Sequence, residues 1–102
     1  MAEQRAASLA DLPAGGCKLV EVRGTPIVLA RVGDQVYACN SACSHQGGPL
    51  GQGVLRGTRL TCPWHGWMYD VRSGQCLLPA RGGAIVTYPV RIESGEIWVD
   101  MP

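Results

Sequence analysis

Two short motifs contain two of the chain's cysteines and both of its histidines. The first is Cys43-Ser44-His45, and the second is Cys62-Pro63-Trp64-His65. Sixteen residues lie between the two motifs. Each motif offers one thiolate and one imidazole from a short loop, so the two loops together present four metal ligands. A metal centre that joins two loops would also stabilise a chain of only 102 residues, whose core must be small. The spacing therefore predicts a fold organised around a metal centre.

The rest of the sequence has the pattern of an all-β protein. Short β-branched or apolar runs alternate with turn signals that contain glycine, among them Arg23-Gly24 and Ser94-Gly95. One helical turn at most is expected, at 8–12. Strands are expected at 17–22, 25–32, 36–39, 60–62, 67–71, 84–92 and 97–99. We predict one domain, 1–102, built as a small antiparallel barrel or sandwich. Its base sheet would come from about 1–40 and 84–102, with a metal-binding unit inserted at about 41–83.

Composition excludes several classes of partner. The net charge of +1 gives no reason to expect nucleic acid. No stretch approaches the ~20 apolar residues of a membrane span, and residues 1–16 have no apolar run of secretion-signal length. The five cysteines are an odd number, which favours a reducing compartment over a disulfide framework. We therefore expect a cytoplasmic protein in which Cys17, Cys39 and Cys76 are buried small hydrophobic residues.

The charges are unevenly distributed along the chain. Segment 41–83 carries four arginines against one aspartate, a balance of +3, and the last twenty residues have a balance of −2. The residues concerned are Arg56, Arg59, Arg72, Arg81 and Asp70 in the first segment, and Arg91, Glu93, Glu96 and Asp100 in the second. Such an asymmetry could orient a docking partner, but scattered solvated arginines are the simpler explanation.

The two motifs resemble those of the Rieske family of [2Fe–2S] proteins. That family uses Cys-x-His and Cys-x-x-His separated by about fifteen to seventeen residues. Cys43, His45, Cys62 and His65 match at every position. Further matches lie at Asn40, Gly53, Leu55, 66–67, 69–70, 73–74 and 78–79, and 12–15 resembles the opening of stand-alone Rieske ferredoxins.

The resemblance implies one [2Fe–2S] cluster, with Cys43 and Cys62 on the inner iron and His45 and His65 on the outer iron. Histidine ligation leaves the oxidised cluster uncharged, and for this reason Rieske potentials lie at about −150 to +300 mV against about −400 mV for plant-type ferredoxins. Residues expected to adjoin or cover the cluster are Gln46, Gly48, Trp64, Gly66, Trp67 and Pro79.

Three of these positions differ from the Rieske subunits of quinol-oxidising complexes. Gly48 and Trp64 stand where those subunits have a disulfide, and Trp67 stands where they have a serine hydroxyl near the cluster sulfur. Because a lost donor to sulfur disfavours the reduced form, we expect a potential in the lower part of the Rieske range.

By resemblance, the chain is a one-electron carrier between a flavin-dependent reductase and a terminal oxygenase of the aromatic ring-hydroxylating type. Partners would touch a tip formed by 46–50, 64–67 and 78–79. The chain would not be an enzyme, because an oxygenase needs a second iron held by two further histidines and a carboxylate. One alternative role is the small Rieske subunit of an assimilatory nitrite reductase.

Two other metal sites are less favoured. A zinc site could use the same four ligands, but zinc would not explain the surrounding resemblance. A four-cysteine cluster of Cys39, Cys43, Cys62 and Cys76 would leave both histidines without a role.

Overall fold

The computed structural model describes residues 2–41, 53–62, 66–78 and 84–101, and it confirms the all-β prediction. All paired strands in these ranges are antiparallel. The elements are β1 (Ala2–Ser8), the 3-10 turn η1 (Leu9–Asp11), β2 (Cys17–Val22), β3 (Thr25–Val32), β4 (Gln35–Asn40), β5 (Val54–Arg56), β6 (Arg59–Thr61), β7 (Met68–Asp70), β8 (Cys76–Leu78), β9 (Thr87–Tyr88), β10 (Val90–Glu93) and β11 (Glu96–Met101).

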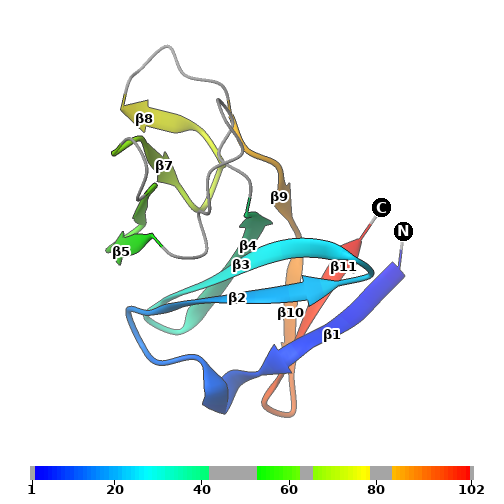
Figure 1. Ribbon diagram of the computed structural model, residues 1–102. Coiled ribbons are helices and arrows are strands. Elements are labelled where there is room, and N and C mark those ends of the chain that lie inside the picture. Colours follow the sequence, from blue (N-terminus) through cyan, green and yellow to red (C-terminus); the bar gives the residue numbers. More distant parts are fainter. Residues whose placement is uncertain (1, 42–52, 63–65, 79–83, 102) are drawn as a thin grey trace.

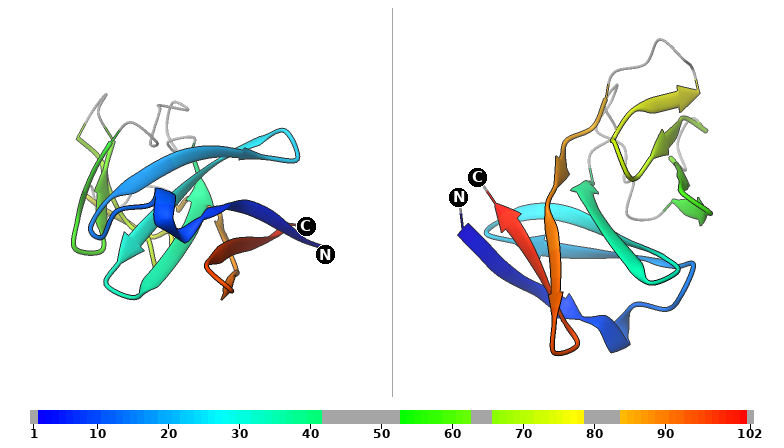
Figure 2. Two further views of the ribbon diagram at one scale, coloured as in Figure 1. Left: turned by 90° about the horizontal axis from the view of Figure 1, so that it is seen from below. Right: turned by 180° about the vertical axis from the view of Figure 1, so that it is seen from behind.

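These strands form three sheets. Two of them, β1-β11-β10 and β2-β3-β4-β9, are called the base sheets here, and β5-β6-β7-β8 is called the small sheet. Figure 1 shows the small sheet at one end of the molecule and the β10–β11 hairpin at the other. The two further views in Figure 2 show the β2-β3-β4-β9 sheet between the other two sheets.

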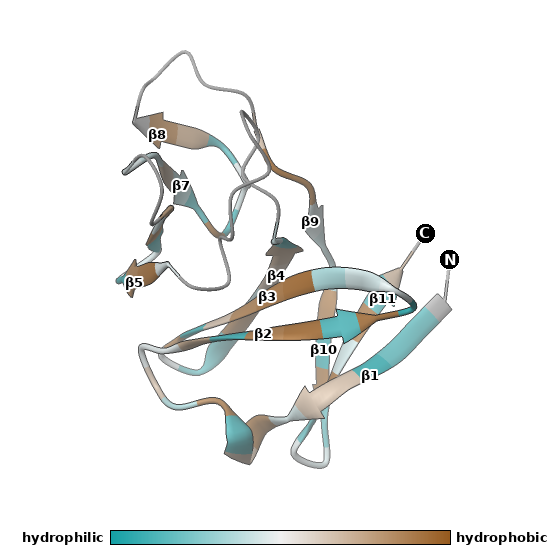
Figure 3. Ribbon diagram, viewed as in Figure 1, coloured by the Kyte–Doolittle hydropathy of each residue, from teal (hydrophilic) through white to brown (hydrophobic). Residues whose placement is uncertain are grey.

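The middle position of β3 explains its continuous apolar sequence, which stands out in Figure 3. Its four central residues are all fully buried, although successive side chains of a strand point to opposite faces. Val28 and Ala30 belong to a core beneath the small sheet, whereas Ile27 and Leu29 belong to a second core against β1 and β11. A strand that is covered on both faces reads as an unbroken apolar run.

Two hairpins of the base sheets close on two-residue turns. Arg23-Gly24 joins β2 to β3 with φ of 52° and 79°, and Ser94-Gly95 joins β10 to β11 with φ of 53° and 76°. Two successive positive φ values are typical of a type I′ turn, whose twist matches that of the strands. Both turns were expected from the sequence.

Some elements differ from the prediction. The run 84–92 is not one strand, because β9 and β10 are separated at Pro89, which has no N–H to donate to a ladder. The sequence did not predict β1, β5 or β8. The expected helical segment at 8–12 is the single 3-10 turn η1. Within the described ranges, no helix has the length and apolar character needed to cross a membrane.

Candidate metal centre

Cys62 directly follows the last residue of β6, and its thiol lies inside the protein. Along this strand Leu60 is fully buried, Thr61 is half-exposed and Cys62 is 1% exposed, so the alternation of a strand continues to the cysteine. Cys62 packs in the core beneath the small sheet, together with Leu60 and Tyr69. This burial excludes water from the sulfur.

Two main-chain hydrogen bonds join Cys62 to the next described residues, Gly66 and Trp67. The Cys62 N–H donates to the Trp67 carbonyl at 2.7 Å, and the Gly66 N–H donates to the Cys62 carbonyl at 3.0 Å. Gly66 has φ of +71°, in the left-handed region that glycine adopts without steric cost. These bonds bring the two ends of the loop that carries the second motif together.

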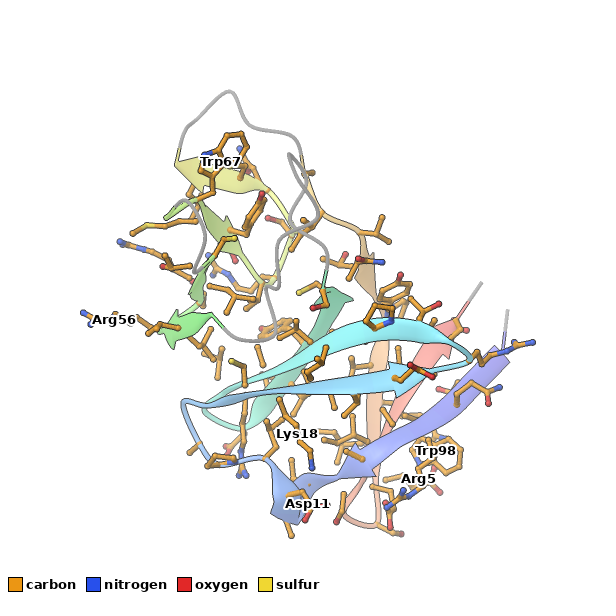
Figure 4. All side chains as sticks on the ribbon, in the orientation of Figure 1. Arg5, Asp11, Lys18, Arg56, Trp67 and Trp98 are labelled. Carbon is orange, nitrogen blue, oxygen red and sulfur yellow. The ribbon has the colours of Figure 1, made fainter. Side chains whose placement is uncertain are left out.

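Trp67 is half-buried and packs against the core that contains Cys62. Figure 4 shows its ring at the end of the small sheet that lies farthest from the base sheets. The role of Trp67 as a residue that covers the metal centre stays a prediction.

The remaining predicted site residues lie outside the described residues. They are Cys43, His45 and His65 among the ligands, and Gln46, Gly48, Trp64 and Pro79 among the covering residues. The described part still fits an iron–sulfur cluster, because Cys62 is a buried thiol that forms no disulfide. It lies at the start of the loop that its hydrogen bonds with Gly66 and Trp67 close. The complete ligand set stays a prediction.

The other described cysteines behave as structural residues. Cys39 and Cys76 are buried in the same core as Cys62, and Cys17 is half-buried. Burial raises the pKa of the Cys17 thiol and, assisted by that neighbouring thiol, raises the pKa of Cys39 to about 12. Since the thiolate is the reactive and metal-binding form, both side chains stay inert at neutral pH.

The four-cysteine alternative loses support from the same core. Cys39, Cys62 and Cys76 are all described, yet no three His, Cys, Asp or Glu side chains in the described ranges are grouped so that they could hold a metal ion.

Comparison with known proteins decides the family. Residues 2–89 match the family model of the Rieske [2Fe-2S] domain. The chain belongs to the Rieske family. It is 35% identical to the ferredoxin component of the naphthalene 1,2-dioxygenase/salicylate 5-hydroxylase systems of Ralstonia sp., over 94% of this chain and 92% of that protein.

Solved structures agree with this Rieske assignment. The ferredoxin of carbazole 1,9a-dioxygenase from Nocardioides aromaticivorans IC177 superposes with a TM-score of 0.90 at 32% identity, over 97% of each chain. A second match, with a TM-score of 0.88 at 28% identity, is to a complex of reduced oxygenase and oxidised ferredoxin in carbazole 1,9a-dioxygenase, and covers 95% of this chain and 91% of that one. The Rieske chain is accordingly an electron carrier rather than an enzyme.

The β7–β8 turn of this Rieske ferredoxin is held by one ion pair. Arg72 donates from its backbone N–H and from Nε to Asp70 Oδ1, at 2.9 and 3.0 Å, and from Nη2 to Oδ2 at 2.8 Å. Hydrogen bonds from the Arg72 guanidinium lower the pKa of Asp70. Because both carboxylate oxygens are occupied, the turn has a defined shape.

The same turn is attached to the segment that returns to the base sheets. The Ile85 N–H donates to the Gly74 carbonyl at 2.8 Å, and next along this segment the Val86 carbonyl accepts from the Asn40 N–H at 2.8 Å. Asn40 is the last residue of β4, where the chain leaves the base. The small sheet is thus fixed to the base through the returning segment 85–86, which is hydrogen-bonded both to the β7–β8 turn and to the end of β4.

Proposed function

We propose that this ferredoxin passes single electrons from a flavin-dependent reductase to a terminal oxygenase of the aromatic ring-hydroxylating type. The observation that carries the proposal is its similarity, over nearly the whole length of both chains, to ferredoxin components of dioxygenase systems. The match to a ferredoxin seen together with its oxygenase supports the oxygenase as a direct partner. The reductase is proposed from the need for an electron donor.

In this proposal Cys43, Cys62, His45 and His65 hold one [2Fe–2S] cluster, which supplies a one-electron redox centre when bound. The burial of Cys62 supports a place for this cysteine at the inner end of the cluster. The places of the other three ligands are proposed from the resemblance alone. Within the described residues, the chain's own contribution is to keep water from the Cys62 sulfur and to shape the second loop through Gly66.

We further propose that the chain is organised as a base, about 1–40 and 84–102, and an inserted cluster-binding unit, about 41–83. The sheet memberships support this division, because β5 to β8 pair with each other and not with the base strands. A cytoplasmic location is part of the proposal, since the odd number of five cysteines favours a reducing compartment.

The alternative role in an assimilatory nitrite reductase is less favoured, because the relatives compared above are ferredoxin components of dioxygenase systems. Reconstitution of electron transfer tests the choice. The purified ferredoxin should support substrate oxidation when combined with a flavin-dependent reductase and a terminal oxygenase of the aromatic ring-hydroxylating type. Stable association with a sirohaem-containing large subunit would instead favour the nitrite reductase role.

Electron paramagnetic resonance on the dithionite-reduced protein tests the cluster. We expect the rhombic signal of a reduced [2Fe–2S] centre with two nitrogen and two sulfur ligands. A silent spectrum together with stoichiometric bound zinc would falsify the assignment.

A matched pair of variants tests the ligand set. Cys62 and Cys76 are 1% and 2% exposed in the same core, so alanine removes a buried sulfur of the same size at each position. Cys62→Ala should abolish the cluster's visible absorption, whereas Cys76→Ala should keep it at a stability cost of about 1–2 kcal/mol. Equal loss of absorption in both variants would show that the ligand set is wrong.

A further inference from the structure

The outward face of the small sheet carries an uncompensated positive charge. Arg56 of β5 and Arg59 of β6 are both exposed and lie directly opposite each other across the two-residue turn that joins their strands. Like charges at opposed positions of an antiparallel pair are destabilising. The hairpin therefore keeps an arrangement that its own stability does not favour.

No acidic side chain in the described part of the chain balances this pair. The nearest candidate by register is Asp70, the β7 partner of Arg59, but Arg72 occupies both of its carboxylate oxygens. In contrast, Arg5 and Arg91 of the base are each paired with glutamates. What distinguishes Arg56 and Arg59 is that, among the described residues, they are two cations without an ion-pair partner that face each other across one hairpin.

The two arginines border an open depression of about 570 Å³ on the small sheet. Its lining, called the arginine patch here, consists of Arg56, Gly57, Thr58, Arg59, Thr61 and Met68. Hydroxyl groups, one thioether and two free guanidinium groups form a surface suited to carboxylates, because arginine binds them in a bidentate manner. Figure 4 shows Arg56 directed away from the base sheets.

The arginine patch lies close to the candidate metal centre. Arg59 and Thr61 point outward from β6, and the next residue along the chain is Cys62, which points inward. Three residues of strand span roughly 10 Å, which is the distance along the strand from Arg59 to Cys62. A protein seated on the patch would therefore have its own surface near the centre.

From these observations we infer that the arginine patch is a docking surface for the acidic surface of a redox partner protein. The partner's carboxylates would neutralise Arg56 and Arg59, which relieves their repulsion and orients the encounter. The inference rests on the proposed function for the nature of the partner. Protection of the exposed edge strand β5 is the competing explanation, but it does not require an arginine on the inner strand β6.

Charge reversal tests the patch. The double variant Arg56→Glu/Arg59→Glu keeps two like charges facing each other, so the repulsion within the hairpin is matched to that of the native protein. The control Lys18→Glu/Arg23→Glu makes the same change in net charge at exposed base residues that have no ion-pair partner in the described ranges. Arg56→Gln/Arg59→Gln serves as a milder variant if the reversal does not fold.

Electron transfer from a flavin-dependent reductase and to a terminal oxygenase of the aromatic ring-hydroxylating type is followed by stopped-flow absorbance at low and high salt. We expect reversal at the patch to slow transfer with at least one partner about tenfold at low ionic strength, and the control to change it less than about twofold. The difference in rate between the patch variant and the native protein should vanish near 0.5 M salt, where the screening length is only about 4 Å. The glutamine variant should show a smaller loss with the same salt dependence.

A second measurement locates the contact without relying on turnover. Amide NMR signals of the ¹⁵N-labelled holoprotein are followed during titration with a flavodoxin chosen for its acidic surface. The largest shifts should fall at 56–61, and they should disappear in the reversal variant. If the native protein exchanges no electrons with either partner but these shifts occur, the proposed function is wrong. The inference that the arginine patch binds an acidic protein surface is then supported.

Three results would overturn the inference. The first is a patch variant that slows transfer no more than the base control does. The second is a loss of rate that persists at high salt. The third is unchanged transfer accompanied by aggregation, which would assign the arginines to edge protection.

Discussion

Gly74 is the residue at which the structure predicts the largest effect of a single methyl group. It is buried in the β7–β8 turn with φ of +78°, and its carbonyl accepts the Ile85 N–H at 2.8 Å. A Cβ atom at this position would lie 2.1 Å from the Ile85 carbonyl oxygen and 3.0 Å from Thr87 Cγ2. The first contact is with backbone, so no side-chain rotation can relieve it.

The cost of Gly74→Ala has two parts. An L-residue in the left-handed region costs about 1–2 kcal/mol. Relief of the clash requires the turn and the returning segment to separate by about 1 Å, since carbon atoms pack no closer than van der Waals contact. This breaks the hydrogen bond to Ile85 and leaves a buried donor unsatisfied, at about 1–3 kcal/mol. The sum is roughly 2–5 kcal/mol, and its upper end lies among the most destabilising single mutations.

Gly95→Ala provides a matched control for this prediction. Gly95 has φ of +76°, but a Cβ atom there would meet nothing within 4 Å. Alanine at this site should therefore cost only the backbone strain of about 1–2 kcal/mol. Circular dichroism of the holoproteins should show the Gly74→Ala midpoint roughly 5–20 °C below that of Gly95→Ala, since the additional cost is about 1–3 kcal/mol. Midpoints within a few degrees of each other would refute the claim that this turn is fastened to the returning segment.

Two further predictions concern the ion pair and the hairpin turns. Because the folded-state pKa of Asp70 is lowered, its contribution to stability is present above the ordinary carboxyl pKa and is lost as pH falls through the lowered value. Urea titrations should therefore show a larger free energy of unfolding for the native protein than for Asp70→Asn at neutral pH, and this difference should decrease below about pH 4. A difference in the free energy of unfolding that does not depend on pH would contradict this. Arg23 and Ser94 hold φ of 52° and 53°, which asparagine tolerates better, so Arg23→Asn and Ser94→Asn should each raise the free energy of unfolding by about 0.5–1 kcal/mol. A lower urea midpoint in either variant would count against the type I′ assignment.

Much of the base was predictable from sequence because its strands are long enough to show a pattern and its turns contain glycine. Strands β2 and β3 have the expected bounds, and both type I′ turns lie where Arg23-Gly24 and Ser94-Gly95 indicated. In contrast, β1 is a polar segment whose strand character comes from pairing with β11 at the other end of the chain. No local signal can report such a contact.

The small sheet was harder to predict for a different reason. Its strands have only three residues each, too few for a period of two to be distinguished from chance. The burial of β3 on both faces was also hidden, since an apolar run does not reveal that alternate residues enter two different cores. Spacing between motifs singled out Cys62 as a candidate ligand, but its hydrogen bond to Trp67 and the contact of Gly74 with Ile85 depend on tertiary structure.

Strand β6 connects the two proposals made for this protein. Because side chains alternate, its inward residues lead from Leu60 to Cys62, whereas its outward residues, Arg59 and Thr61, form part of the arginine patch. One short strand can thus offer a ligand to the metal centre and a charge to a partner without contact between the two side chains. A partner held at Arg59 acts on the centre through proximity and electrostatic potential, not through a shift of the ligand. Charge reversal at the patch should therefore change the rates of electron transfer and their salt dependence, while the absorption spectrum of the bound cluster stays the same.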